Sequence, residues 1–525
     1  MCELKQATIG QMLAETAKRY SLRAAMEFGG KQWSYAQLDG STDDIAAGLI
    51  ALGFRKGDVL GFWCEAEPNT VLLFYAALKI GAVPAMFHPG LCEKELRDLA
   101  QRCHIRGFAF GGCRGESPVP AVRSLGLPAD AVWYIGETAQ SQLPDLHSLI
   151  RLGKTVPRSV LEDAKARVCP ADVATLLFTS GTTGDSKIVP DTHFSWVNMG
   201  IQQARDLDAT CCDRFCVALP VCHCFSISVN LMAALAVGGC LYFPRSRHTE
   251  DLLTAISAGK CTIFSSVPAL FHALVSRKDL EKFDLSSLRT GFIGGSICTE
   301  ALFLRISRRL GMTLLSSLGQ TEATAAITTT TAKDPLTLRA RTVGHMIPHV
   351  EGKILDLQSG EPLPTGQRGE LCIRGYSCMQ GYYGDPEATA AAIDPAGFLH
   401  TGDVGYFDDA GNLHLTGRRK ELIIRGGENI SPAEIANAVM QDERVLECQC
   451  VGVPDAHYGE EVCLCIRLKP GTELAPEEIL ASLRESLASY KLPKYIVLLD
   501  QFPRTPGGKI RTGALAEQMR QQLGL

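Results

Sequence analysis

Helix-like and strand-like segments alternate along the whole chain, and this alternation restricts its fold more than any other feature. Residues 43–52 have the apolar spacing of a helix and end at Gly53, a candidate C-cap. Residues 59–63 (VLGFW) have the continuous apolar character of a buried strand. No internal repeat or low-complexity tract interrupts the pattern. We therefore expect an α/β fold in which helices cover largely parallel sheets.

The chain has 525 residues, more than one hydrophobic core usually organises, so one large and one small domain are expected. The last part has two strand-like segments and one helix-like segment, at 447–453, 461–468 and 476–490. A turn-rich stretch, 408–412 (DDAGN), precedes this unit, and we place the boundary at 416–420. The prediction is a multi-layer α/β domain over 1–419 and a small α+β domain over 420–525.

Charge and cysteine content limit the partners and the compartment. A formal net charge of -5 provides no general basic field, so nucleic acid is not an expected partner. The N-terminal twenty residues are polar and helix-like, without the features of a signal peptide, so we expect a cytoplasmic location and reduced thiols. The apolar stretch 221–243 contains polar side chains that are costly in a bilayer, and it is predicted to be a buried helix leading into a strand, not a transmembrane segment.

The densest group of the 20 cysteines is a candidate zinc site. It consists of Cys211, Cys212, Cys216, Cys222 and Cys224, with His223. Paired C-x-x-C spacing is absent from it, so we favour small core residues over metal ligands.

A loop rich in small residues follows the strand-like segment 175–178. Its residues are Thr179, Ser180, Gly181, Thr182, Thr183 and Gly184, with Lys187 close behind. Backbone N–H groups and hydroxyls in such a loop can approach phosphate oxygens, and the lysine adds positive charge. The spacing differs from that of a Walker A loop. A nucleoside triphosphate is the predicted ligand.

Further motifs follow in order: Leu219-Pro220 with His223, Gly294-Gly295-Ser296, Gly319-Gln320-Thr321-Glu322, Thr401-Gly402-Asp403, Gly417-Arg418-Arg419-Lys420 and Pro506-Gly507-Gly508-Lys509. Together with the phosphate loop, this set resembles the acyl-adenylate-forming superfamily, which includes acyl-CoA synthetases, nonribosomal-peptide adenylation domains and luciferases. The resemblance spans residues 35–515. It implies that the chain uses ATP to activate a carboxylic acid as an acyl-adenylate.

The resemblance also implies roles for these motifs. Thr321 would contact the α-phosphate, and Glu322 would be both catalytic and the Mg²⁺ ligand, a role that suits its hard oxygens. Asp403 would accept hydrogen bonds from the ribose hydroxyls, and Arg418 would contact the ribose and phosphates. The nucleotide-binding set is completed by Gly294, Gly295, Ser296, Leu318, Gly319 and Gln320.

Two lysines separate the half-reactions in the superfamily. Lys509 would bridge the substrate carboxylate and the α-phosphate during adenylation, where a cation stabilises the developing charge. The C-terminal domain would then rotate about Lys420 and present Gly426 and Gly427 to the pantetheine of coenzyme A. The implied domains are an AMP- and acyl-binding domain and a mobile C-terminal domain.

The acyl pocket is the remaining implied site. His223 matches the residue that gates it, with a buried structural histidine as the alternative. The predicted wall is mainly apolar: Phe225, Ser226, Phe264, Ser265, Val267 and Ser296. No Asp stands where amino-acid-activating relatives hold the substrate ammonium, so a fatty or aryl acid is expected.

Three positions depart from the usual pattern of the superfamily. Leu318 replaces an aromatic residue that stacks on adenine, Ser186 replaces a common proline, and Lys420 stands where many relatives have Asp. The acyl acceptor is expected to be coenzyme A, with an acyl carrier protein as the alternative. A non-catalytic nucleotide-binding protein is the competing class, and a monomer or homodimer is expected.

Overall fold

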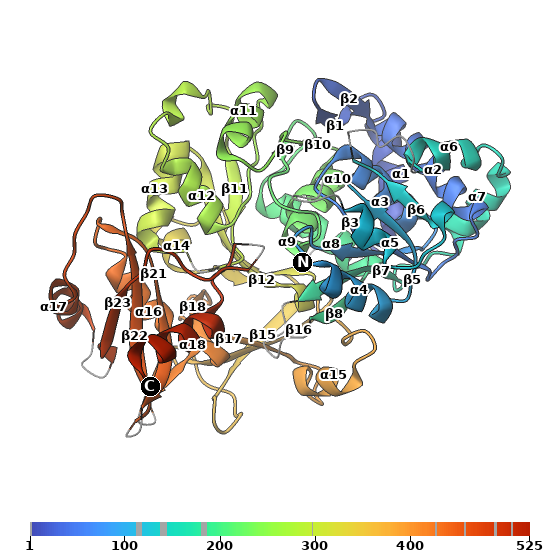
Figure 1. Cartoon of the computed structure of the whole chain (residues 1–525). Helices are drawn as coiled ribbons and strands as arrows, with labels where there is room; N and C mark the ends of the chain where they lie inside the picture. The colour runs from blue at the N-terminus through green and yellow to red at the C-terminus, as the bar shows by residue number, and fades with distance from the viewer. Residues whose placement is uncertain are drawn as a thin grey trace.

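The computed structural model describes residues 3–111, 118–136, 144–179, 186–296, 298–425, 428–455, 458–487, 491–505 and 508–525. Within these ranges, five β-sheets and their helices form a large body and a separate C-terminal lobe, drawn in orange to red in Figure 1. The predicted α/β fold with a smaller C-terminal unit is confirmed.

The largest sheet has six strands in the order β6-β5-β3-β4-β7-β8. Its strands are β3 (Val59–Trp63), β4 (Val83–Phe87), β5 (Ile105–Phe110), β6 (Val132–Tyr134), β7 (Val173–Thr179) and β8 (Lys187–Thr192). All neighbours are parallel except β7 and β8, which form a hairpin. Every residue of β3 and β4 is buried, as expected where helices cover both faces of a sheet. The predicted strands at 59–63 and 175–178 are thus confirmed.

Two four-stranded sheets continue the body. Their orders are β2-β1-β10-β9 and β11-β12-β13-β14. The strands are β1 (Ala24–Phe28), β2 (Lys31–Ser34), β9 (Arg214–Cys216), β10 (Cys240–Tyr242), β11 (Thr290–Ile293), β12 (Thr313–Gln320), β13 (Ala325–Thr329) and β14 (His345–Met346). Ile263 bridges both β9 and β11, so the two sheets are nearly continuous.

A fourth sheet is wholly antiparallel, which the alternating sequence pattern did not indicate. It consists of β15 (Val350–Leu355), β16 (Gly369–Gly375), β17 (Leu399–Phe407) and β18 (Leu413–Arg418). The turn at 408–412 joins β17 to β18, so residues early in β17 lie opposite residues at the end of β18.

Fifteen described α-helices belong to the body: α1 (Ile9–Arg19), α2 (Tyr35–Ala51), α3 (Pro68–Lys79), α4 (Glu93–Arg102), α5 (Val119–Arg123), α6 (Leu146–Gly153), α7 (Arg158–Ala166), α8 (His193–Asp206), α9 (Cys224–Ser226), α10 (Ala233–Val237), α11 (Thr249–Gly259), α12 (Pro268–Val275), α13 (Glu300–Leu310), α14 (Leu336–Arg341) and α15 (Pro386–Ala392). Capping boxes begin α1, α2 and α8. The predicted helix at 43–52 is the second half of α2.

The apolar stretch 221–243 is a buried helix leading into a strand, as predicted. A π-helical segment, Ile227–Met232, connects α9 to α10, and Gly238 ends α10 in the left-handed conformation before β10. None of the described helices combines the length and the apolar character needed to cross a bilayer. The cytoplasmic location stays a prediction.

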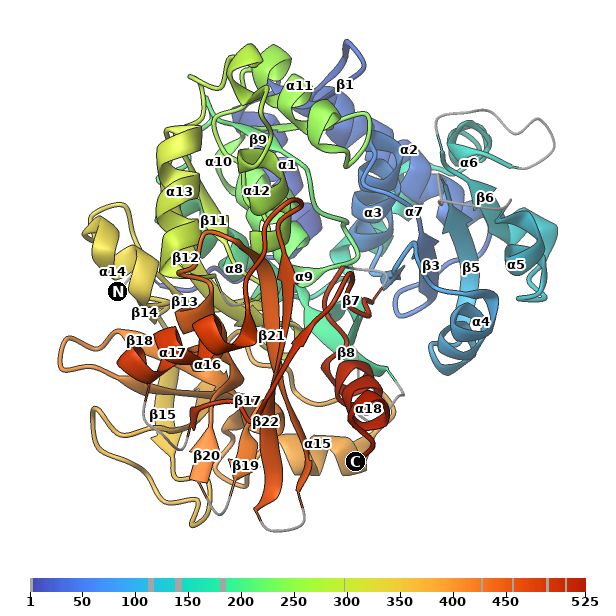
Figure 2. The same cartoon turned by 60° about the vertical axis from the view of Figure 1, so that its left-hand side comes forward.

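The described residues of the C-terminal lobe form a five-stranded sheet and three α-helices. Its elements are β19 (Ile423–Arg425), β20 (Glu428–Ile430), α16 (Pro432–Val439), β21 (Val445–Asp455), β22 (Gly459–Leu468), α17 (Pro476–Ser486), β23 (Tyr495–Leu498) and α18 (Thr512–Leu523). Figure 2 shows the long strands β21 and β22 flanked by these helices. Both predicted strands and the predicted helix are present, although residues 488–490 lie outside the described ranges. β18 ends at Arg418 and β19 begins at Ile423, but the boundary at 416–420 stays a prediction.

Candidate active site

A tight turn between β12 and β13 carries Thr321 and Glu322. A Cβ on Gly319 would lie 1.8 Å from the carbonyl oxygen of Ala325, so only glycine permits this approach of the two strands. Thr324 and Ala325 have positive φ angles of 52° and 120°. The backbone is therefore sharply folded where it presents the predicted phosphate and metal-binding side chains.

The Glu322 carboxylate is held from a neighbouring loop. Tyr382 donates from its hydroxyl to Glu322 Oε1 (2.9 Å), and the N–H of Met379 donates to the Glu322 carbonyl oxygen (2.8 Å). Lys187 Nζ lies 4.4 Å from the centroid of the Tyr382 ring, a cation–π distance. Tyr382, which the sequence analysis missed, thus connects the lysine of the phosphate loop to Glu322.

Asp403 and Arg418 are partners across β17 and β18. Arg418 Nε lies 2.9 Å from Asp403 Oδ1, whereas the buried Oδ2 has no hydrogen-bond partner within the described part of the chain. Burial raises the pKa of Asp403 to about 6, and the Arg418 guanidinium opposes that rise. A buried acceptor without a donor is costly. Ribose hydroxyls are donors that suit Oδ2.

The loop after β11 lies close to β12. A Cβ on Gly294 would be 2.8 Å from the Ser317 carbonyl oxygen, and Gly295 has a φ of +81° with Val267 beside it. The Phe225 ring also borders Gly294, and Ser296 is exposed. The structure thus brings Phe225, Val267 and the glycine loop together.

Three of the predicted wall residues do not line this region. Phe264, Ser265 and Ser226 are fully buried among protein atoms. Ser265 Oγ accepts from the N–H of Phe292 (3.0 Å), Ser226 donates to the Leu219 carbonyl (2.9 Å), and the ring of Phe264 packs edge-on against Phe271. The predicted wall is wrong for these three residues, because their polar atoms and rings are used by the core.

Lys509 of the C-terminal lobe reaches this part of the body. Its charge acts on the pKa of both His223 and Cys224, and Cys224 Sγ lies 3.8 Å from Thr321 Oγ1. Although the Lys509 side chain is solvent-accessible, its crowded surroundings and the Arg418 guanidinium lower its ammonium pKa. His223 is likewise accessible, yet desolvation by the surrounding protein, and then the charges of His88, Lys509 and Arg247, lower its pKa to about 4. A residue of the second lobe thus lies close enough to His223 and Cys224 for its charge to act on both.

Comparison with known proteins shows the family to which the chain belongs. The AMP-binding enzyme family matches residues 13–383, and the AMP-binding enzyme C-terminal domain matches residues 434–509. The chain belongs to the AMP-binding enzyme family. The predicted membership of the acyl-adenylate-forming superfamily is thereby confirmed.

Relatives of this AMP-binding enzyme cover nearly its whole length. The putative acyl-CoA synthetase YngI of Bacillus subtilis (strain 168) is 34% identical, over 100% of this chain and 99% of its own. The mitochondrial medium-chain acyl-CoA ligase ACSF2 of Danio rerio is 33% identical, over 99% of this chain and 90% of its own. The crystal structure of the anthranilate CoA ligase AuaEII with anthranoyl-AMP has the same fold, with a TM-score of 0.88, 22% identity, and coverage of 100% of this chain and 99% of that one.

Several predicted residues of this AMP-binding enzyme fall at element ends. Thr179 and Lys187 are partners at the end of the β7–β8 hairpin, and Gln320 ends β12. Leu318 is buried in a core cluster, so it offers no stacking surface. Ser180, Gly181, Thr182, Thr183, Gly184, Gly426 and Gly427 lie outside the described residues.

Lys420 lies in the 3-10 turn Arg419–Glu421, directly after β18. The preceding residue is fixed to the body, because Arg419 Nη1 lies 2.9 Å from Oε2 of the buried Glu370. Glu370 Oε1 also accepts from the N–H of Gly402 (3.1 Å). The segment that enters the C-terminal lobe is thus attached to the body immediately before Lys420.

Two residues of the cysteine-rich segment, Cys222 and His223, lie beside His88, which is distant in the sequence. His88, Cys222 and His223 have potential ligand atoms within 4.8 Å of one another. However, the N–H of Gly90 donates to His88 Nδ1 (3.0 Å), so Nε2 of the neutral ring carries the hydrogen and cannot bind a metal ion. Cys212 is exposed and away from this group, and all described cysteines are free thiols.

Proposed function

We propose that this AMP-binding enzyme is an AMP-forming acid:CoA ligase. It activates a carboxylic acid with ATP as an acyl-adenylate, releases pyrophosphate, and transfers the acyl group to coenzyme A with release of AMP. The observation that supports this proposal most strongly is the approach of Lys509, from the second lobe, to the side of the body that holds Thr321, Asp403 and Arg418.

Adenylation needs charge stabilisation more than a protein nucleophile. A carboxylate oxygen attacks the α-phosphorus, the bond to pyrophosphate breaks, and AMP becomes the leaving group for the next step. Two anions approach each other, so a preorganised ammonium at Lys509 lowers the barrier more than it stabilises the separate substrates. The Thr321 hydroxyl is positioned by the β12–β13 turn to donate to the α-phosphate.

The residues present suit a magnesium ion at Glu322. Tyr382 engages one carboxylate oxygen as a neutral donor, and no described lysine or arginine forms an ion pair with Glu322. The second oxygen is therefore available as a hard ligand of the kind Mg²⁺ prefers. When bound, Mg²⁺ neutralises charge on the triphosphate and the departing pyrophosphate.

Thioester formation requires a second arrangement of the lobes. We propose that the C-terminal domain, residues 420–525, rotates about Lys420, withdraws Lys509, and brings Gly426 and Gly427 to the pantetheine. The short segment between β18 and β19 belongs to no sheet, so a rotation there would break no strand pairing.

The acid is proposed to lack an α-amino group. Phe225 and Val267, beside the glycine loop, provide apolar surface, and the relatives include a medium-chain acyl-CoA ligase and an anthranilate CoA ligase. An aliphatic or aryl acid is the substrate class that this chemistry favours.

A panel of carboxylic acids tests the function. Pyrophosphate release and CoA-dependent AMP formation should be measured for aliphatic, aryl and α-amino acids, with Lys509→Ala as the matched inactive enzyme. Neutral aliphatic or aryl acids should give the highest kcat/KM. Preference for an amino acid would overturn the pocket assignment, and faster turnover with a holo-acyl carrier protein than with CoA would overturn the acceptor. Absence of pyrophosphate release with every acid would overturn the enzymatic proposal.

A further inference from the structure

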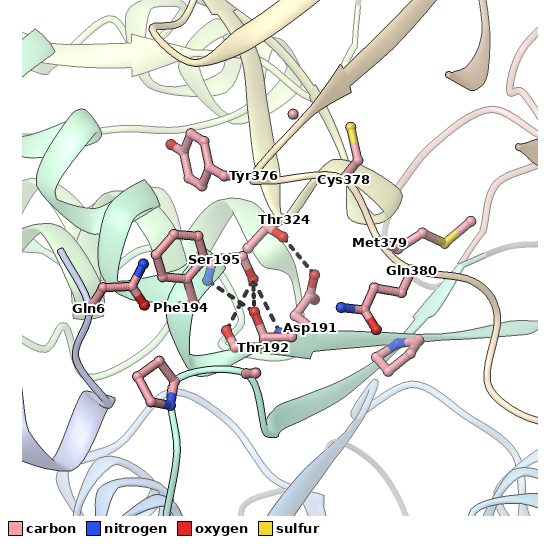
Figure 3. A pocket seen from close by; sticks show the side chains of 14 residues that line it. Gln6, Asp191, Thr192, Phe194, Ser195, Thr324, Tyr376, Cys378, Met379 and Gln380 are labelled. Atoms are coloured by element: carbon pink, nitrogen blue, oxygen red, sulfur yellow. Dashed lines mark hydrogen bonds between the residues drawn. The ribbon is translucent and has the colours of Figure 1, made fainter. Parts of the chain in front are cut away.

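Asp191 is a buried acid behind the β12–β13 turn. It lies on β8, in the same strand as Lys187, and only 2% of its surface is exposed. Figure 3 shows its carboxyl group directed at Thr324. Asp191 Oδ1 lies 2.8 Å from Thr324 Oγ1, and the same Oγ1 lies 2.7 Å from the carbonyl oxygen of Ser377. Three segments of the site meet at this one hydroxyl.

Counting hydrogens determines the state of Asp191. The Thr324 hydroxyl has one hydrogen to give, and a carbonyl oxygen can only accept, so Thr324 must donate to Ser377. The remaining short contact then needs a hydrogen from Asp191. Both hydrogen bonds are complete only when Asp191 is a carboxylic acid that donates to Thr324 Oγ1.

We propose that Asp191 is a positioning residue for adenylation: its carboxylic O–H donates to Thr324, and this relay to Ser377 fixes the turn that presents Thr321 and Glu322. The inference rests on the proposed adenylation chemistry and adds a residue that never touches the substrate.

The turn needs such support because its backbone is strained. Thr324 is β-branched and has a φ of +52°, and Ala325 has a φ of +120°, conformations that persist only where the surroundings hold them. At the start of the turn, the N–H of Met379 donates to the Glu322 carbonyl oxygen, and Met379 follows Ser377 by two residues. The relay and the Met379 hydrogen bond therefore brace the turn from both ends against the same loop.

The surroundings of Asp191 agree with a protonated acid. Burial raises its pKa well above the usual value, and the nearby negative charge of Glu322 acts in the same direction. Asp191 Oδ2 has no hydrogen-bond partner within the described ranges, and no described cation pairs with the carboxyl group. A hollow of about 370 Å³ adjoins Asp191 and Thr324 (Figure 3), which leaves room for a larger apolar side chain.

Substitutions that keep or remove the donor test the relay. Asp191→Asn keeps an N–H that can donate to Thr324, whereas Asp191→Leu and Thr324→Val break the chain. We expect Asp191→Leu and Thr324→Val to lower the rate of pyrophosphate release about 10- to 100-fold and to raise the Mg²⁺ concentration required, since a misplaced catalytic group costs this much. Asp191→Asn should stay within about threefold of the wild type. Thioester formation from synthetic acyl-adenylate and CoA should survive in all three.

Asp206, at the end of α8, is a matched control because it also accepts a hydrogen bond from a threonine of the β12–β13 region. Thr329, at the other end of β13, donates to Asp206 Oδ2 (2.9 Å), and burial raises the pKa of Asp206 to about 7. Asp206→Leu removes a half-buried acid that also accepts from a threonine, without touching the turn, so it should lower the thermal midpoint without changing the Mg²⁺ requirement.

Affinity for Mg²⁺ with α,β-methylene ATP, measured by calorimetry, separates this inference from the proposed function because it needs no acid substrate. Weaker binding in Asp191→Leu and Thr324→Val, with Asp191→Asn rescued, supports the relay even if no acid is turned over. Equal losses in Asp191→Asn and Asp191→Leu, or the same Mg²⁺ shift in Asp206→Leu, would overturn it.

Discussion

Replacing Lys509 with alanine should stop adenylation while leaving thioester formation largely intact. The variant removes an ammonium from the place where the carboxylate and α-phosphate meet. Lys509 is solvent-accessible, so a near-surface dielectric of about 20 applies. At a separation of about 4 Å, one unit charge then contributes about 4 kcal/mol. That energy corresponds to a loss of about 1000-fold in the rate of pyrophosphate release.

Single-turnover assays of each half-reaction would measure this loss directly. Lys494→Ala is the matched control, because it also removes a positive charge from the C-terminal lobe. Among the ion pairs of the described residues, Lys494 pairs only with the half-buried Asp455 of its own lobe (2.7 Å). This variant should leave both half-reactions unchanged. If Lys509→Ala slowed adenylation and thioester formation equally, the lysine would be structural and the two-arrangement mechanism would be wrong.

The pH dependence follows from the same lysine. Lys509 must be protonated to act, and its pKa is lowered by desolvation and by Arg418. Adenylation should therefore fall as pH rises through a value below about 10.4, the ordinary lysine pKa. Lys509→Arg stays charged at that pH, so any activity it retains should persist to higher pH. If the rate of adenylation by Lys509→Arg fell at the same alkaline pH as that of the wild type, the titrating group would not be Lys509.

Three other substitutions probe the remaining parts. Lys420→Pro fixes φ at the proposed pivot, so single-turnover thioester formation should collapse while pyrophosphate release continues; the opposite pattern would refute the pivot. Asp403→Asn should raise the KM for ATP about tenfold, the effect of about one lost charged hydrogen bond. The wild-type KM should also rise as pH falls through about 6, because Asp403 becomes protonated there. A KM that does not change with pH would argue against ribose binding at Asp403. Gly319→Ala places a Cβ 1.8 Å from the Ala325 carbonyl oxygen, so denaturant titration should show a loss of about 1–3 kcal/mol together with lost adenylation; an unchanged protein would mean that the strands separate easily.

Local signals in the sequence were sufficient for much of the fold and part of the site. The continuous apolar run of β3 predicted a strand buried on both faces, and it is buried at all five positions. The turn at 408–412 joins β17 to β18, and this hairpin is what makes Asp403 and Arg418 partners. Short-range patterns carried these predictions because the chain reverses within a few residues.

Contacts between distant segments could not be read in the same way. Tyr382 reaches Glu322 across 60 residues, and Thr324 reaches Asp191 across 133. Phe264 and Ser265 were predicted for the acyl wall, yet they face the core, since residue type alone does not determine which side of a strand or loop is filled. The one available signal for Asp191 was an acidic residue within the otherwise mainly apolar segment Ile188–Thr192.

The ion pairs of Arg418 with Asp403 and of Arg419 with Glu370 have a mechanical consequence. Two consecutive residues are held to the body by buried carboxylates, so we expect β18 to stay with the body when the lobe rotates as proposed. The proposed rotation of the lobe would therefore start at the next residue, Lys420. One of the two ion pairs also belongs to the proposed ribose site, so we expect bound nucleotide to strengthen the attachment of Arg418 to the body from which the lobe would rotate.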